Sequence, residues 1–418
     1  MDLAEKQLTA LNQLIEVVGS SNSFYKAKLE ACQGMGGFES LEAFSERMPF
    51  TTKAEIAEDH KCNPPYGTNL SYPKGQYTRI HQTSGTTGQP IAWLDTQESW
   101  SWLLDNWKLI WKACGAKKGD VAMFPFSFGP FLGFWSAFEA AAQAGIRCIP
   151  AGGQTSLQRL QMINRYQPDW LCCTPTYALH LLSVAQKEGI DLSSGPVRRI
   201  IVGGEPGGSV PEVKSRIEEG WGGAKLFDHH GMTEVGPVTY SDPERPELLR
   251  AIHETYFIEV LDTESGKPTL PGDVGELILT TLGRAASPLI RYRTGDLVKP
   301  VPVEGEDPRA VAFEGGILGR SDDMVVVRGV NLYPSAIDAV IRSFDGIGEY
   351  QVHIDEKESM VQVAVTVENL SAAGDDELAN QVQKRMREVF GLRIQIEIGE
   401  SGSLPAFEMK AKRWNVSI

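Results

Sequence analysis

Hydroxyl residues and glycines are concentrated at positions 83–90, where the sequence reads TSGTTGQP. Glycines let a turn wrap closely around an anion, and its backbone N–H groups and hydroxyls can donate to phosphate oxygens. The segment is not a Walker A loop, because the ending Gly-Lys-Ser/Thr is missing. A polar surface turn could have the same composition, but this one follows an expected strand, YTRIHQ.

Further polar motifs lie downstream and favour the phosphate-loop interpretation. DHHGMTE (228–234) sets a hydroxyl beside a carboxylate, and YRTGD (292–296) offers a carboxylate suited to a ribose diol. GRSDD (319–323) lies where a second domain is expected, and the basic segment KAKR (410–413) lies near the end of the chain.

In this order the motifs resemble those of the adenylate-forming superfamily of acyl-CoA synthetases, peptide-synthetase adenylation domains and luciferases. The resemblance is strongest to the phenylacetate–CoA ligase family, whose hinge segment is very like GRSDDMVVVRGVNLYPSAID. SNSFYKAKL (21–29), IVGGEP (201–206) and PLIRYRTGDL (288–297) match it as well. The similarity covers nearly the whole chain.

The resemblance implies an acid–thiol ligase. It would convert a small aromatic carboxylic acid and ATP to acyl-AMP and pyrophosphate, then transfer the acyl group to coenzyme A. Transfer to a carrier-protein phosphopantetheine, or to an amine or hydroxyl acceptor in natural-product biosynthesis, stays open because the motifs concern ATP alone. The joint presence of Glu234, Asp296, Arg320 and Lys410 disfavours a non-catalytic adenylate-binding protein, and the missing Walker lysine disfavours an unrelated NTPase.

The same resemblance assigns residues to the nucleotide. Those expected to bind ATP or AMP are Ser84, Gly85, Thr86, Thr87, Gly88, Gly204, Glu205, Pro206, Asp228, His229, Thr233, Asp296 and Arg320. Asp296 would bind the ribose hydroxyls, helped by Arg320, and Glu234 would be both catalytic and the Mg²⁺ ligand. One Glu suffices, because Mg²⁺ commonly takes one or two carboxylates plus phosphate oxygens. Gly204 and His229 are also expected in the acyl pocket.

A catalytic lysine and a hinge are implied too. Lys410 would bring positive charge to the α-phosphate and the attacking carboxylate, because two anions must approach each other there. Lys412 is the competitor, since the family usually has Gly just before this lysine, but the spacing from Pro405 favours Lys410. A solvated basic tail is the other interpretation. Asp322 would be the hinge about which the small domain rotates between the two half-reactions.

The stretch PFSFGPFLGFW (125–135) is unusually aromatic, and in the family the corresponding stretch borders the acyl pocket. Phe128 and Phe131 could pack against an aryl ring. Aromatic runs are more often core than pocket, so both interpretations stay open for these two residues. Phe134 and Trp135 are expected in the core.

Departures from the family pattern concern charge and metal binding. Gln89 stands where many relatives have Lys, which removes a cation from the phosphate loop. Gly295 stands where close relatives often carry Arg. Some relatives bind structural zinc through cysteines around a His, but 237–260 contains His253 and no cysteine, so no structural zinc is expected.

The elements that must position these residues follow two patterns. Strand-like and helical runs alternate at 121–126, 134–145, 147–150 and 157–166. This alternation is typical of an α/β domain with largely parallel sheets. Shorter strands at 256–261 and 274–281, joined by Gly and Pro turns, predict a small antiparallel sheet or barrel appended to it.

After Gly319 the pattern resets. Strands and helices are expected over 324–329, 334–344, 350–355, 360–368, 377–391 and 393–399. This predicts a compact, mobile α+β domain of about 100 residues. We therefore expect an N-terminal AMP-binding domain over 1–319 and a C-terminal mobile domain over 320–418.

Composition limits the partners and the location. The 418 residues have the composition of a soluble globular protein, and the net charge of −14 argues against binding nucleic acid or an anionic membrane. It weakly disfavours an acidic carrier protein. No apolar run could cross a bilayer, and apolar residues at helical spacing predict an amphipathic N-terminal helix rather than a signal peptide. A cytoplasmic location is expected, with a homodimer implied by resemblance alone.

Overall fold

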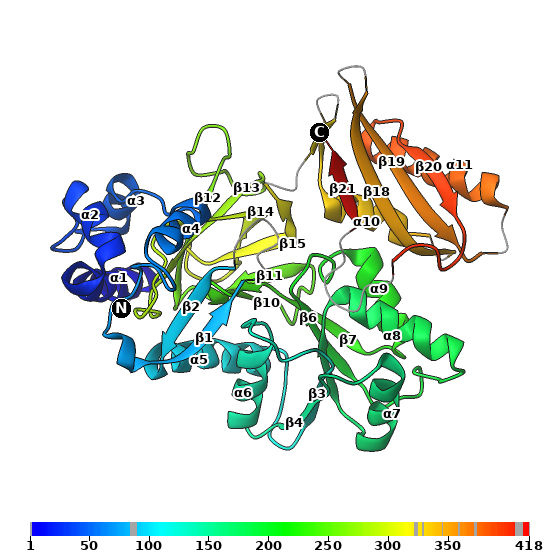
Figure 1. Cartoon of the computed structure of the whole chain (residues 1–418), viewed down its shortest axis with the longest axis horizontal. Coiled ribbons are helices and arrows are strands. Elements are labelled where there is room, and N and C mark those ends of the chain that lie inside the picture. Colours follow the sequence, from blue (N-terminus) through cyan, green and yellow to red (C-terminus); the bar gives the residue numbers. More distant parts are fainter. Residues whose placement is uncertain are drawn as a thin grey trace. The chain divides into compact units, whose positions relative to one another are not determined.

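The computed structural model describes residues 2–83, 90–321, 325–327, 330–344, 346–357, 360–371, 374–405 and 413–417. The chain divides into two compact units, and Figure 1 shows their elements. Unit 1 comprises Met1–Gly153 and Phe227–Gly316, and unit 2 comprises Gln154–Leu226 and Ile317–Ile418. We describe each unit by itself.

Unit 1 opens with helices α1 (Leu3–Ser21), α2 (Ser23–Ala31), α3 (Leu41–Arg47) and α4 (Lys53–Cys62), drawn in blue in Figure 1. A capping box begins α1: Asp2 and Glu5 each accept from the other's backbone N–H, which satisfies two donors that a helix start leaves free. The buried face of α1 carries Leu11 and Val18, which belong to one hydrophobic cluster with Phe257. The expected amphipathic helix is therefore confirmed.

A hairpin of β1 (Tyr77–Gln82) and β2 (Ala92–Thr96) follows the short 3₁₀ helix η1 (Lys74–Gln76). Thr96 caps α5 (Gln97–Ala113), so this helix begins where β2 ends. Strands β3 (Val121–Phe124) and β4 (Arg147–Pro150) pair in parallel, and α6 (Trp135–Gln143) connects them in sequence. The expected strand–helix–strand alternation is confirmed in this part of unit 1.

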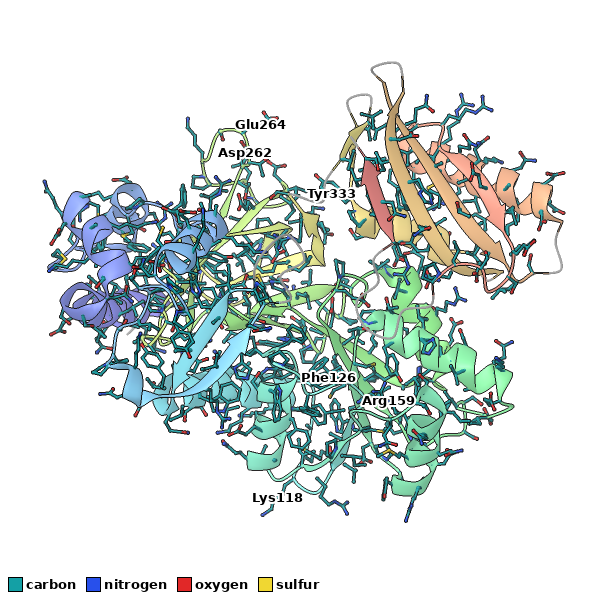
Figure 2. All side chains as sticks on the ribbon, viewed as in Figure 1. Lys118, Phe126, Arg159, Asp262, Glu264 and Tyr333 are labelled. Atoms are coloured by element: carbon teal, nitrogen blue, oxygen red, sulfur yellow. The ribbon has the colours of Figure 1, made fainter. Side chains whose placement is uncertain are left out.

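An antiparallel sheet runs in the strand order β10-β11-β15-β14-β13-β12. Its strands are β10 (Thr239–Ser241), β11 (Leu248–Ala251), β12 (Tyr256–Leu261), β13 (Gly275–Thr281), β14 (Tyr292–Pro302) and β15 (Val311–Arg320). Every residue of β13 is buried. Asp262 and Glu264 lie on the loop between β12 and β13 (Figure 2). The small antiparallel sheet predicted from 256–261 and 274–281 is confirmed.

Before that sheet, short strands lead into the candidate site. They are β7 (Lys225–His229), β8 (Gly231–Met232) and β9 (Gly236–Pro237). β8 and β9 form a tight antiparallel hairpin, in which Gly231 pairs with Pro237 and Met232 pairs with Gly236. The turn between these two strands carries Thr233 and Glu234.

Unit 2 begins with alternating helices and strands. They are α7 (Ser156–Tyr166), β5 (Trp170–Cys173), α8 (Pro175–Lys187), β6 (Arg199–Gly203) and α9 (Pro211–Gly220). β5 and β6 pair in parallel. Proline at the first position of α8 fits a helix start, because its missing N–H would have no partner there.

The rest of unit 2 is an α+β region. Its elements are β16 (Val325–Val327), β17 (Val330–Leu332), α10 (Pro334–Arg342), β18 (Ile347–Lys357), β19 (Met360–Asn369), α11 (Asp375–Phe390), β20 (Gln395–Gly399) and β21 (Trp414–Ser417). The sheet order is β20-β19-β18-β21, with β18 and β19 antiparallel and the outer pairs parallel. Apolar faces of α10, α11 and these strands form one core, to which Ile337, Val365 and Val382 contribute.

The α/β class and the C-terminal α+β region are confirmed, and β21 was not predicted. Among the described residues, no helix is long and apolar enough to span a membrane.

Candidate active site

The turn that carries Glu234 is held by close packing and by a hydrogen bond. Gly236 has a φ of +87°, and a Cβ on it would lie 2.1 Å from Leu103 Cδ2, so this position strongly favours glycine. The Tyr256 hydroxyl donates to the Val235 carbonyl at 2.7 Å. The backbone beside Glu234 is therefore fixed by packing and by a buried hydrogen bond.

A buried ion pair supports the same turn. Arg284 donates to Asp95 from Nε to Oδ1 at 2.8 Å and from Nη2 to Oδ2 at 2.6 Å. Both side chains are fully buried. Nη1 of Arg284 donates to the carbonyls of Thr233 and Glu234, at 2.9 and 2.7 Å. Neither Arg284 nor Asp95 was among the residues predicted from the sequence.

The Glu234 carboxylate suits a hard cation. The Tyr292 hydroxyl donates to Glu234 Oε1 at 3.2 Å, and no contact among the described residues engages the other oxygen of this half-buried carboxylate. The described residues contain no group of three or more His, Cys, Asp or Glu that could hold a metal by itself. Phosphate oxygens and water would have to complete the coordination, as is usual for Mg²⁺ in nucleotide sites. The residues present therefore fit a Mg²⁺–nucleotide complex.

Asp228 and His229 lie at the end of β7 and are buried. The backbone N–H of His229 donates to Asp228 Oδ1 at 2.9 Å. His229 Nδ1 lies 2.8 Å from the Thr239 carbonyl, which can only accept, so this nitrogen carries the proton. Burial lowers the pKa of His229 to about 3, and the ring is neutral near pH 7. Trp107 packs against that ring, with centroids 4.3 Å apart.

Asp296 lies on β14 close to the same motif. Its Oδ2 is 3.2 Å from His230 Nε2, and both side chains are largely buried. The backbone N–H of Asp296 donates to Thr294 Oγ1 at 3.0 Å. Gly295 has a φ of +76°, a left-handed conformation that an Arg at this position would adopt only with strain. The structure thus brings Asp296 beside the DHHGMTE motif.

The predicted phosphate loop, Ser84–Gly88, lies outside the described residues, but its flanks are defined. The Thr83 N–H donates to the Ile91 carbonyl at 3.0 Å, and Ile91 N–H donates back to Thr83 Oγ1 at 3.1 Å. Gln82 N–H donates to the Pro130 carbonyl at 2.8 Å, which ties the end of β1 to the aromatic stretch.

Within that stretch, Phe128 is half-buried in a cluster of rings. Its centroid lies 4.6 Å from Phe126, 4.7 Å from Trp135 and 5.2 Å from Phe138. Phe126 is marked in Figure 2. Phe131 is also half-buried.

The remaining described site residues belong to unit 2. Gly204 follows β6 with a φ of +88°, a conformation that favours glycine. Glu205 Oε1 accepts from the backbone N–H of Thr176 at 2.8 Å, at the first turn of α8. Glu205 and Pro206 line a cavity of about 100 Å³. Arg320 is the last residue of β15, a strand whose final residues, Ile317–Arg320, belong to unit 2.

The same cavity is lined by Arg413, which follows the predicted lysine segment. Arg413 binds Glu349 through Nε to Oε1 at 2.6 Å and through Nη2 to Oε2 at 3.1 Å. Burial acts to raise the pKa of Glu349, but the hydrogen bond and charge of Arg413 hold it below its usual value. Nη1 donates to Thr176 Oγ1 at 3.4 Å. Arg413 is thus anchored rather than solvated. Lys410, Lys412 and Asp322 lie outside the described residues.

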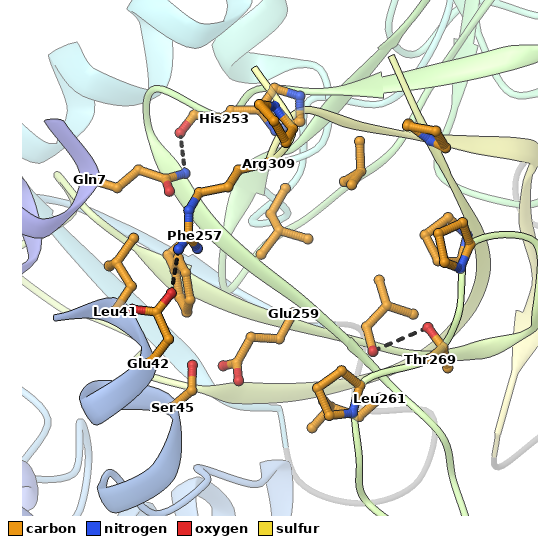
Figure 3. A pocket seen from close by; sticks show the side chains of 18 of the residues that line it. Gln7, Leu41, Glu42, Ser45, His253, Phe257, Glu259, Leu261, Thr269 and Arg309 are labelled. Atoms are coloured by element: carbon orange, nitrogen blue, oxygen red, sulfur yellow. Dashed lines mark hydrogen bonds and ion pairs between the residues drawn. The ribbon is translucent and has the colours of Figure 1, made fainter. Parts of the chain in front are cut away.

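A separate cavity of about 590 Å³ lies in unit 1 beside α3, β12 and β14 (Figure 3). Ion pairs of Arg309 with Glu42 and of Arg291 with Glu259 form part of its wall. None of the described residues that were predicted to bind ATP, metal or acid lines it. We therefore place the candidate active site elsewhere, around Glu234 and Asp296.

Family models match the chain in two places. One describes an AMP-binding enzyme and covers residues 39–284, and the other describes an AMP-binding enzyme C-terminal domain and covers residues 329–415. The phenylacetate-coenzyme A ligase of Pseudomonas putida is 30% identical, over 98% of this chain and 93% of its own length. That of Escherichia coli K12 is 32% identical, over 88% of this chain and 84% of its own length. A crystal structure of 2-hydroxyisobutyryl-CoA ligase with a bound acyl-AMP superposes with a TM-score of 0.91, at 28% identity, covering 98% of this chain and 89% of the other.

Proposed function

Because this chain belongs to the family of AMP-binding enzymes, we propose that it activates a carboxylic acid with ATP and transfers the acyl group to coenzyme A. The observation that carries the proposal is the cluster around Glu234, where a metal-compatible carboxylate lies in a fixed turn and is bonded to Tyr292. Asp296, on the same strand as Tyr292, offers a carboxylate for the nucleotide.

The reaction has two steps. A carboxylate oxygen of the acid attacks the α-phosphorus of ATP, the bond to the β-phosphate oxygen breaks, and pyrophosphate leaves with that electron pair. The coenzyme A thiol, after losing its proton to solvent, then attacks the acyl carbon and displaces AMP. The first step needs charge neutralisation and alignment, because both reactants are anions.

The proposed roles divide between the two units. In unit 1, Glu234 holds the metal and Asp296 binds the ribose hydroxyls. When bound, Mg²⁺ neutralises phosphate charge and orients the triphosphate. From unit 2, Arg320 assists at the ribose and Lys410 supplies the positive charge at the α-phosphate. Asp322 is the proposed hinge between the half-reactions.

For the acid, we propose an aromatic substrate. Support comes from the two relatives named phenylacetate-coenzyme A ligase and from the Phe126–Phe128 ring cluster beside the flank of the loop 84–89. A small branched hydroxy acid is the second candidate, because the 28%-identical structural relative is named 2-hydroxyisobutyryl-CoA ligase.

For the acceptor, coenzyme A is favoured by the names of the same relatives. A carrier-protein phosphopantetheine, or an amine or hydroxyl, is the alternative, because the residues around Glu234 concern ATP and not the acceptor.

The test is pyrophosphate release over a panel of aryl acids and short hydroxy acids, with and without coenzyme A. We expect release with aryl acids and an acyl-CoA product when coenzyme A is present. Release confined to hydroxy acids would overturn the aromatic assignment. Acid-dependent release with no thioester would overturn coenzyme A as acceptor. No release with any acid, despite ATP binding, would contradict the ligase.

A further inference from the structure

The pair of Asp95 and Arg284 is unusual in its burial. Both side chains have no exposed surface. A buried ion pair often contributes little net stability, because the cost of removing two charges from water offsets their attraction. Asp95 is nevertheless fully engaged, since Ser99 Oγ also donates to its Oδ1 at 2.9 Å. A pair of this kind calls for a role beyond stability.

The geometry of the guanidinium points to that role. Two of its nitrogens bind the Asp95 carboxylate, and the third donates to two successive carbonyls, those of Thr233 and Glu234. The planar fork of Arg can bind a carboxylate and still present a donor in a fixed direction, which Lys cannot do. Arg284 therefore determines where the peptide units beside the Glu234 side chain lie.

The three elements joined by this pair come from distant parts of unit 1. Asp95 lies near the end of β2, the strand that leaves the segment 84–89. Arg284 follows β13, and the turn with Glu234 lies between β8 and β9. One guanidinium thus connects the strand that follows the predicted phosphate loop to the turn that bears the predicted metal ligand.

We propose that Arg284, oriented by Asp95, is the positioning residue that fixes Glu234 for binding of the Mg²⁺–ATP complex. The inference rests on the proposed function for the role of Glu234 in holding Mg²⁺. The proposed role of Arg284 involves no contact with the nucleotide. Arg284 acts by holding the backbone of the turn, while the Tyr292 hydroxyl donates to one oxygen of the Glu234 carboxylate.

If Arg284 and Asp95 only stabilised the fold, their loss would leave the Mg²⁺ dependence of ATP binding unchanged. A second ion pair in unit 1 serves as a control that separates a stabilising role from a positioning role. Arg291 and Glu259 form a similar two-contact ion pair, with both bonds at 2.9 Å and about a tenth of each side chain exposed. No contact of Glu259 reaches Thr233 or Glu234 among the described interactions. Glu259→Gln should therefore lower stability without disturbing the metal ligand.

The experiment is ATP binding by isothermal titration calorimetry on the full chain, over a series of Mg²⁺ concentrations starting in EDTA, with no acid or coenzyme A present. Arg284→Lys is expected to raise the Mg²⁺ concentration for half-maximal ATP binding by about tenfold, the scale of one lost charge-assisted hydrogen bond. Binding in EDTA should be unchanged. Glu259→Gln should lower the melting temperature and keep the wild-type Mg²⁺ dependence.

Ser99→Ala is a milder second variant, which can be measured even if Arg284→Lys does not fold. It removes one donor to Asp95 and should shift the Mg²⁺ dependence in the same direction by about threefold. A Mg²⁺ dependence equal to wild type in both variants would overturn the inference, as would a wild-type chain that binds ATP equally with and without Mg²⁺. Loss of the ligase itself would show separately, as absence of pyrophosphate release by a wild-type chain that still binds Mg²⁺–ATP.

Discussion

Two arginines, Arg284 in unit 1 and Arg413 in unit 2, each bind a carboxylate through two nitrogens. They differ in the acceptor of the third nitrogen. Arg284 is fully buried and uses its remaining nitrogen on backbone carbonyls. Arg413 keeps about a tenth of its side chain exposed and uses its remaining nitrogen on the Thr176 hydroxyl. The carbonyls of Thr233 and Glu234 belong to the backbone of a tight turn, whereas the Thr176 hydroxyl lies on a side chain that can rotate.

The difference fits the two kinds of residue that the arginines support. Arg284 donates to the backbone carbonyl of Glu234, a proposed metal ligand whose side chain must keep one position. Arg413 directly follows the segment with Lys410, a residue proposed to act in the first half-reaction. In unit 2 the anchor is a strand end, where the Val352 N–H donates to the Arg413 carbonyl at 2.7 Å. We infer that unit 1 presents a fixed nucleotide site and that unit 2 presents a side-chain-mediated anchor.

The largest expected effect concerns Lys410, three residues before Arg413 in the sequence. Lys410→Ala should reduce acyl-AMP formation by about a thousandfold, the scale of losing a preorganised charge at the reacting phosphate, while ATP binding persists. Single-turnover formation of acyl-AMP and ATP titration measure the two properties. Lys412→Ala is the matched control, and a dead Lys412 variant beside an active Lys410 variant would reassign the catalytic lysine.

Substitutions in the aromatic stretch 125–135 test which of its residues pack in the core of unit 1 and which contact the acid. Phe128 contacts Phe126, Trp135 and Phe138, so Phe128→Ala should lower the free energy of unfolding by about 3 kcal/mol. Urea unfolding measures that loss. Phe131→Ala should cost less stability and change the ratio of kcat/KM between aryl and hydroxy acids. An unchanged ratio with a large stability loss would place Phe131 in the core instead.

A third prediction uses the buried His229. The unfolded chain takes up a proton at this residue below about pH 6.5, whereas burial keeps the folded ring neutral until about pH 3. The stabilising contribution is therefore complete above about pH 6.5 and is lost as pH falls. Between about pH 7 and pH 5, His229 alone should cost about 2 kcal/mol of unfolding free energy.

Urea unfolding at the two pH values, in wild type and His229→Asn, measures that contribution. The groups facing the ring are the Thr239 carbonyl, Trp107 and His230, and the amide of Asn can still donate to the carbonyl. The variant should lose less stability on acidification. His353→Gln changes an exposed histidine on β18 and is the control. Equal slopes in wild type and His229→Asn would contradict the prediction.

The smallest expected effect concerns the anchor itself. Arg413→Lys cannot keep both contacts with Glu349, and it should slow acyl-AMP formation by about tenfold. Thioester formation from supplied acyl-AMP should change much less. Arg385→Lys, on an exposed ion pair of α11, is the matched control. Equal slowing of both half-reactions would show that Arg413 only stabilises unit 2.

Local pattern explains what could be predicted from the sequence. The strand at 256–261 has the predicted bounds, because aromatic and β-branched residues fill it and turn residues follow it. β21 was missed, since four residues after a basic segment carry too little pattern, and its pairing with β18 is a long-range contact. Helices α2 to α4 are short and were not predicted either.

The candidate site shows the same limit. Asp228, His229 and Glu234 could be proposed from the sequence because they lie together in one motif. Arg284 was not predicted, although it lies between the strand at 274–281 and the segment 288–297. Its partner Asp95 is 189 residues away, and no local spacing links the two residues. Tyr292 lies in the YRTGD motif, but its contact with Glu234 depends on how β14 packs beside the β8–β9 turn. Phe128 was ambiguous, because aromatic side chains suit both a pocket and a core.

The most direct test of the central claim follows one oxygen atom. The chain is supplied with ATP, Mg²⁺, coenzyme A and an acid from the panel in which both carboxylate oxygens are ¹⁸O. The masses of the products are then measured by mass spectrometry. Attack on the α-phosphorus predicts that AMP gains one ¹⁸O and that acyl-CoA keeps the other. Label in inorganic phosphate with ADP as the nucleotide product would mean attack at the γ-phosphorus, and would contradict the adenylate mechanism proposed for this chain.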